Sequence, residues 1–116
     1  MELQTQTVNI QNGDVTLPAY LAMPTGEGPY AAIVVLQEIF GVNAHIRAVA
    51  DRIAHEGYIA IAPALYHRQA PDFETGYTPE DIKIGRQYKV QTKADELLSD
   101  IQAAIDYVKQ LPQAKP

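Results

Sequence analysis

Two continuously apolar segments, residues 30–36 and 58–63, stand out along the chain. Such runs are typical of strands that are covered on both faces of a sheet. Between them, apolar residues recur every three or four positions, which predicts an amphipathic helix with Asn43 as its cap and Gly57 as its stop. The apolar stripe of this helix consists of Ile46, Val49, Ala50, Ile53 and Ala54. Strand, helix and strand in this order predict a βαβ unit.

A β-hairpin is predicted before this unit. Residues 8–10 and 17–23 have the composition of two short strands. Asn12 and Gly13 lie between them, and this pair tolerates the positive φ angles that tight hairpin turns require. The hairpin would place two antiparallel strands beside the βαβ unit.

Two further helices are predicted after an irregular segment at residues 65–77. Thr78 can cap the first, because proline and two acids follow it. The second begins near Thr92 and ends at Pro112. Its expected buried face consists of Leu98, Ile101, Ile105 and Val108. An alternating fold would continue with another strand, so the fold class is α/β with an open three-layer sheet that looks interrupted.

Composition narrows the class of protein. The 116 residues are enough for one domain, and 47% hydrophobic with 20% charged residues is typical of a globular chain. A net charge of -5 gives no reason to expect nucleic acid as a partner. The sequence has neither a signal peptide nor an apolar stretch near the roughly 20 residues of a membrane helix. We therefore expect a cytoplasmic protein that does not enter a membrane.

Glu38 is the candidate for acid–base chemistry. It follows the first apolar strand directly, and ligands of open α/β sheets bind beyond the carboxyl ends of the strands. The residue could also be a solvated loop acid. A nucleotide-binding function has little support, because no glycine-rich phosphate loop follows either strand and Glu38 would repel a phosphate.

A nucleophile is harder to find. The chain has no cysteine, and its one serine, Ser99, lies within the last predicted helix without a nucleophile elbow. His45 and His55 are ten residues apart and would face different directions on one helix, so no metal site or other cofactor is expected. Arg68 and Asp72 could pair with each other or contact a substrate.

Three blocks of sequence carry a family resemblance: residues 37–43, the Gly57-Tyr58 pair, and residues 63–71. In this order they resemble the dienelactone hydrolase (carboxymethylenebutenolidase) family of α/β-hydrolases. The resemblance runs from about Thr7 to Pro112 and corresponds to the first half of a family member. Residues 1–116 are thus interpreted as the N-terminal half of such a domain.

The resemblance implies an eight-stranded hydrolase with a cysteine nucleophile, an aspartate and a histidine, all downstream of Pro116. It implies that Glu38 contacts the nucleophile and that the backbone N–H of Ile39 is one donor of the oxyanion hole. Tyr88 matches a tyrosine near the substrate pocket. The family arginine one helical turn earlier is Ile84 here. Candidate substrate-binding residues are therefore Tyr88, Arg68 and Arg86.

Two functions remain open at this point. One is half of an ester or lactone hydrolase that is inactive by itself. The other is a non-catalytic truncated module. In the family's strand order, the missing next strand would flank residues 31–36, which leaves an apolar edge that invites pairing with another chain. We therefore expect a homodimer, a larger assembly, or association with a complementary half-domain.

Overall fold

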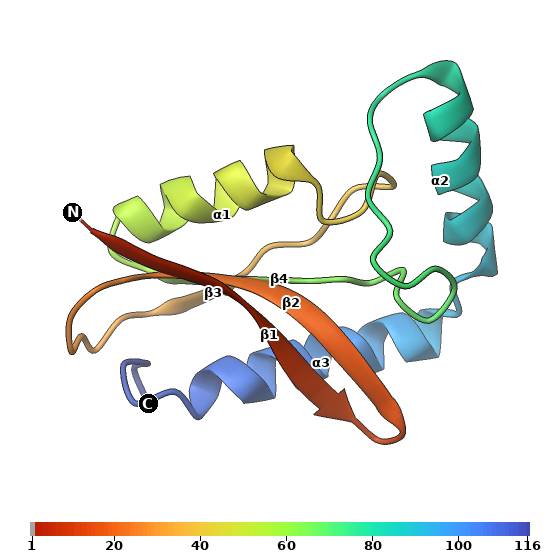
Figure 1. The fold of residues 1–116 in the computed structure, drawn as a ribbon. Helices are drawn as coiled ribbons and strands as arrows, with labels where there is room; N and C mark the ends of the chain where they lie inside the picture. Colours follow the sequence, from red (N-terminus) through yellow and green to blue (C-terminus); the bar gives the residue numbers. More distant parts are fainter. Residues whose placement is uncertain (1) are drawn as a thin grey trace.

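The computed structural model describes residues 2–116. Four strands form one mixed sheet in the order β1-β2-β4-β3, and α1 and α3 cover its opposite faces, while α2 stands apart at one end (Figure 1). The predicted α/β class with a three-layer open sheet is confirmed. The elements are β1 (Leu3–Asn12), β2 (Val15–Pro24), β3 (Ala32–Val34), α1 (Ala44–His55), β4 (Ile59–Pro63), α2 (Pro79–Gln91) and α3 (Ala94–Lys109).

The predicted hairpin is present, but its strands are longer and its turn lies one residue later. β1 and β2 are antiparallel, and Asn12 pairs with Val15. The two-residue loop is therefore Gly13-Asp14 rather than Asn12-Gly13. Gly13 has φ 61° and supplies the positive φ at the first loop position. The longer strands follow from pairing, because the ladder includes polar residues that a hydrophobic pattern does not mark as strand.

β4 divides the core into two layers of different side-chain size. All five of its residues are buried. Ile59 and Ile61 pack in the core on the α3 side of the sheet, whereas Ala60 and Ala62 pack with Ala50 and Ala54 of α1. Successive strand residues point to opposite faces, so small residues gather under α1 and larger ones under α3.

The prediction that residues 30–36 are covered on both faces is wrong. Ala32 is exposed, Leu36 is 53% exposed, and Val35 is the one buried residue of the segment. The reason is the strand order: β3 pairs with β4 in parallel on one side and is the last strand of the sheet. As the last strand of the sheet, β3 lacks side chains of a neighbouring strand on one side, so its own side chains are less covered.

The end of the chain meets the start of this apolar segment. The Tyr30 N–H donates to the Gln113 carbonyl at 2.7 Å, and the Lys115 N–H donates to the Tyr30 carbonyl at 2.9 Å. Tyr30 and Ala114 thus form a parallel bridge. The tail begins a fourth ladder beside the start of β3 and leaves the outward backbone groups of Ala32 and Val34 without a partner among residues 2–116.

Helix boundaries follow the capping chemistry that the sequence predicts. The Asn43 side chain accepts a hydrogen bond from the Ile46 N–H at the start of α1, and Gly57, with φ 95°, lies just past its end. Thr78 and Asp81 form a capping box at the start of α2. Within residues 2–116, none of these helices is both long enough and apolar enough to span a membrane.

The predicted buried face of α3 is partly wrong. Leu98 is 65% exposed, and the buried residues of the helix are Asp100, Ala104 and Val108. These three lie four residues apart and share one face. Position 98 is two residues from Asp100, which on an α-helix places it on the far side. A search for hydrophobic positions misses this face because one of its buried residues, Asp100, is charged.

Candidate active site

A cavity of about 400 Å³ opens beyond the carboxyl ends of β3 and β4. Its walls come from the loop after β3, the loop after β4, the end of α2 and the first turns of α3. This is the expected place for a ligand in an open α/β sheet. The lining residues include Leu36, Gln37, Glu38, Ile39, Leu65, Tyr66, Lys89, Leu97 and Ile101.

Glu38, which the sequence predicts at the strand end, and Ile39, which the family resemblance names, both line this cavity. The Glu38 carbonyl accepts hydrogen bonds from the Gly41 N–H at 3.2 Å and from Nε2 of Gln37 at 3.1 Å, which form a tight turn. The Glu38 side chain is exposed and has no ion-pair or hydrogen-bond partner within residues 2–116. The Ile39 N–H likewise has no acceptor in the described part of the chain.

Two glycines let other segments approach this turn closely. At Gly41, with φ 82°, an added Cβ would overlap the Phe73 carbonyl. At Gly85 of α2, an added Cβ would overlap the Ile39 carbonyl. The backbone of Ile39 is therefore packed directly against α2.

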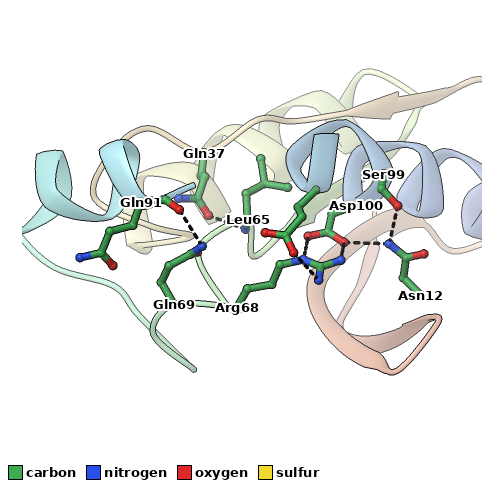
Figure 2. Close-up of polar contacts among 9 residues, drawn as sticks. Asn12, Gln37, Leu65, Arg68, Gln69, Gln91, Ser99 and Asp100 are labelled. Atoms are coloured by element: carbon green, nitrogen blue, oxygen red, sulfur yellow. Dashed lines mark hydrogen bonds and ion pairs between the residues drawn. The ribbon is translucent and has the colours of Figure 1, made fainter. Parts of the chain in front are cut away.

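A polar contact joins the loops after β3 and β4. The Gln37 side-chain oxygen accepts a hydrogen bond from the Leu65 N–H at 2.8 Å (Figure 2). Gln69 of the second loop donates to the Gln91 carbonyl at the end of α2 at 3.4 Å. These contacts tie three walls of the cavity to one another.

Arg68 binds α3 and not Asp72. Its Nε and Nη2 atoms donate to the two carboxylate oxygens of Asp100 at 2.9 and 3.0 Å, and Nη1 donates to Glu96 at 3.3 Å (Figure 2). Asp72 is exposed and has φ 60°. The proposed local pair is wrong because Asp100, buried on the facing helix, offers a bidentate partner. Because Asp100 and Glu96 already bind the guanidinium of Arg68, a structural role is favoured for this residue over contact with a substrate.

Asn12 extends this ion pair to the hairpin. Its Nδ2 donates to Asp100 at 2.8 Å and to the Ser99 hydroxyl at 3.0 Å (Figure 2). Ser99 is exposed on α3 and does not line the cavity, so it is not placed as a nucleophile. Within residues 2–116, no three histidine or acidic side chains are grouped so that they could hold a metal ion.

Tyr66, Phe73 and Tyr88 form an aromatic cluster next to the cavity. The Tyr88 ring lies 6.0 Å from Tyr66 and 4.9 Å from Phe73, measured between centroids. Tyr66 lines the cavity and Tyr88 does not, so Tyr88 contacts the site through Tyr66. Burial raises the pKa of Tyr66, which keeps its hydroxyl protonated at neutral pH.

The cation in the cavity wall is one that the sequence reasoning missed. Arg86 lines a different groove, along α2, together with Lys83. Lys89 is the cation that lines the cavity with Glu38 and Ile39. A usable signal was present: Lys89 is four residues after Gly85 and therefore lies on the helix face that meets the turn.

Comparison with known proteins decides the family. The sequence profile described as "Dienelactone hydrolase family" matches residues 17–116. The chain belongs to the dienelactone hydrolase family. It is 36% identical over 111 residues to the carboxymethylenebutenolidase of Pseudomonas putida, covering 93% of this chain and 46% of that enzyme. A Synechocystis sp. relative is 53% identical over 116 residues, with 100% of this chain and 47% of the relative covered.

Solved structures of the family have the same fold. A Klebsiella pneumoniae structure superposes with a TM-score of 0.81 at 33% identity, over 95% of this chain and 45% of that chain. The dienelactone hydrolase of Anabaena variabilis, at 18% identity, shows the fold with a TM-score of 0.63, over 98% of this chain and 48% of its own. The chain therefore spans less than half the length of these dienelactone hydrolase relatives.

Proposed function

We propose that this chain supplies one wall of the active site of an ester or lactone hydrolase, and that a segment outside residues 1–116 supplies a cysteine nucleophile. One observation carries the proposal. Glu38 and Ile39 line one cavity at the carboxyl ends of the strands, and the Ile39 N–H has no hydrogen-bond acceptor within residues 2–116. The chain contains no cysteine, and its one serine lies outside that cavity.

The two groups have distinct chemical roles in this proposal. A nucleophile attacks the carbonyl carbon of the ester, and the carbonyl oxygen becomes an oxyanion. The Ile39 N–H donates to this oxyanion, a contribution of about 2.7–4 kcal/mol for one such donor. The Glu38 carboxylate, which has no ion-pair or hydrogen-bond partner within residues 2–116, would accept or hold the proton of the nucleophile.

The cavity walls indicate the kind of ester that fits. Leu36, Leu65, Leu97 and Ile101 present apolar surface. Lys89 adds one ammonium group to that wall and would favour an ester or lactone that carries a negative charge. The roles of Tyr88 and Arg86 in substrate binding remain predictions. Within residues 2–116, the Tyr88 ring contacts Tyr66 of the cavity wall, and Arg86 is exposed on α2.

A complementation assay tests the proposal. The chain alone should hydrolyse a p-nitrophenyl ester no faster than its Glu38→Ala variant. Mixing the chain with a polypeptide that corresponds to the remaining C-terminal part of the Synechocystis relative should create turnover. Glu38→Ala should then lower that turnover by about 10²–10⁴-fold. Glu38-dependent turnover by the chain alone, or complemented turnover that ignores Glu38, would contradict the proposal.

A second candidate function is a non-catalytic module that associates through β3. The observation that favours it is the free edge of β3. The backbone N–H and C=O of Tyr30 point away from β4 and bind the tail. Because these directions alternate along a strand, the backbone N–H and C=O of Ala32 and Val34 also point away from β4. A second copy that paired along all of residues 30–36 would displace the tail. A parallel strand that continues from Ala114 would not, so the edge favours a complementary segment over a homodimer.

Substitutions at Val34 test this edge. Val34→Pro removes an outward N–H while the inward bond from the Val35 N–H to Ile61, at 2.8 Å, remains possible. We expect light scattering to show self-association or a complex with the complementary polypeptide for the native chain, and neither for Val34→Pro. Val34→Thr keeps the N–H and should behave like the native chain. A monodisperse native monomer at micromolar concentration, with and without the complement, argues against this interface.

A further inference from the structure

Asn43 is one of the few buried polar residues and makes contacts in two directions. Its side chain is 6% exposed. The Oδ1 atom accepts a hydrogen bond from the Ile46 N–H at 3.2 Å and so caps α1. The Nδ2 atom donates to the Thr75 carbonyl at 3.3 Å and to the Tyr77 hydroxyl at 3.2 Å. The Oδ1 atom thus caps the helix, and the Nδ2 atom holds residues 75–77.

The segment that Asn43 holds packs against the turn after β3. The Thr75 N–H donates to the Phe40 carbonyl at 3.0 Å, and Glu74 forms an antiparallel bridge with Gly41. The Tyr77 and Phe40 rings meet edge to face with centroids 4.5 Å apart. Phe40 is the residue directly after Ile39, so these contacts fix the peptide that follows the oxyanion donor.

Arg47, one turn further along α1, holds the same two segments. Its Nη1 donates to the Val42 carbonyl at 2.8 Å, and its two terminal nitrogens each lie 3.2 Å from one carboxylate oxygen of Glu74. Asn43 and Arg47 are four residues apart and so lie on one side of the helix start. The start of α1 thus holds residues 74–77, and these in turn contact Phe40 and Gly41.

We propose that Asn43 is a positioning residue for the Ile39 N–H, acting through Thr75, Tyr77 and Phe40. The inference rests on the proposed function, in which that N–H binds the oxyanion. Such a donor must be held within about 0.5 Å of its productive place. Serine, threonine and aspartate cap a helix as well as asparagine does, but none of them also offers an N–H₂ donor. The dual contact therefore explains why the residue is asparagine.

Asn43→Ser separates the two functions of the side chain. Serine retains an oxygen that can cap α1 and loses both donors to the 75–77 segment. We expect hydrogen exchange of the Thr75 amide to accelerate about five- to tenfold. Exchange of the Ile46 and Ile61 amides should stay unchanged, and ¹⁵N relaxation should show greater mobility of the Ile39 amide. The matched control is Asn9→Ser, an exposed asparagine on β1, which should change none of these signals.

Three results would overturn the inference. The first is a Thr75 amide whose exchange does not change. The second is an Ile39 amide whose ¹⁵N relaxation does not change although Thr75 exchanges faster. The third is acceleration of Thr75 and Ile61 by the same factor, which would show a loss of global stability with no local effect. If Asn43→Ser does not fold, Tyr77→Phe removes one acceptor and keeps the ring contact, and a Thr75 amide unchanged in that variant also counts against it. Because the readout needs no ester, its failure would leave the hydrolase proposal standing, and the complementation assay tests that separately.

Discussion

Arg68→Met is expected to lower the free energy of unfolding by about 3–5 kcal/mol, because it leaves Asp100 as an uncompensated buried charge. The Asp100 side chain is 1% exposed and accepts two hydrogen bonds from this guanidinium. The hydrogen bond with Asp100 also raises the pKa of Arg68. A raised pKa in the folded state stabilises the protein at every pH below the ordinary value, so the pair persists throughout the neutral range.

Urea denaturation followed by circular dichroism measures this loss, and a double variant supplies the control. Arg68→Met with Asp100→Leu removes both charges and should recover most of the lost stability, because well-packed apolar residues often replace a buried pair without cost. A loss below about 1 kcal/mol in the single variant would mean that the pair behaves as a surface salt bridge. A double variant as unstable as the single one would show that packing, and not the charge, is the cause.

Gly85→Ala is expected to displace the turn that carries the proposed oxyanion donor, the Ile39 N–H. An alanine Cβ at this position would overlap the Ile39 carbonyl. We expect a loss of about 1–3 kcal/mol in stability from overpacking, although alanine is the better helix former by about 1 kcal/mol. In the complemented hydrolase the larger effect is on turnover, because a misplaced Ile39 N–H costs about 10²–10³-fold in kcat.

Gly76→Ala is the matched control for this substitution. A Cβ at Gly76 would meet the end of the Asp81 side chain at 3.3 Å, which can move aside, and the position needs no positive φ. Gly85→Ala should shift the Ile39 amide signal in a ¹⁵N spectrum and lower complemented turnover, whereas Gly76→Ala should do neither. If Gly85→Ala stabilises the chain by its helix propensity and leaves the Ile39 signal in place, α2 does not position this donor.

Local sequence patterns were sufficient to predict the βαβ unit, the helix caps and the position of Glu38. The apolar runs and the helical stripe around Ile46 specify the βαβ unit because side-chain spacing follows backbone geometry. The cap at Asn43 and the capping box at Thr78 are local hydrogen-bond motifs, visible within a few residues of sequence. Glu38 became a candidate because a carboxylate directly after an apolar strand must lie at the sheet's carboxyl end.

The tertiary structure decided which neighbours these elements have. The exposure of β3 depends on the order of strands in the sheet, and no property of residues 30–36 themselves reports it. The partner of Arg68, Asp100, is 32 residues away on α3, and the cation of the cavity, Lys89, lies far along the chain from Glu38. Periodicity and caps describe a chain one element at a time, whereas burial and ion pairing depend on which elements meet. The sequence by itself therefore determined the elements and the place of Glu38, and only the tertiary structure decided what surrounds them.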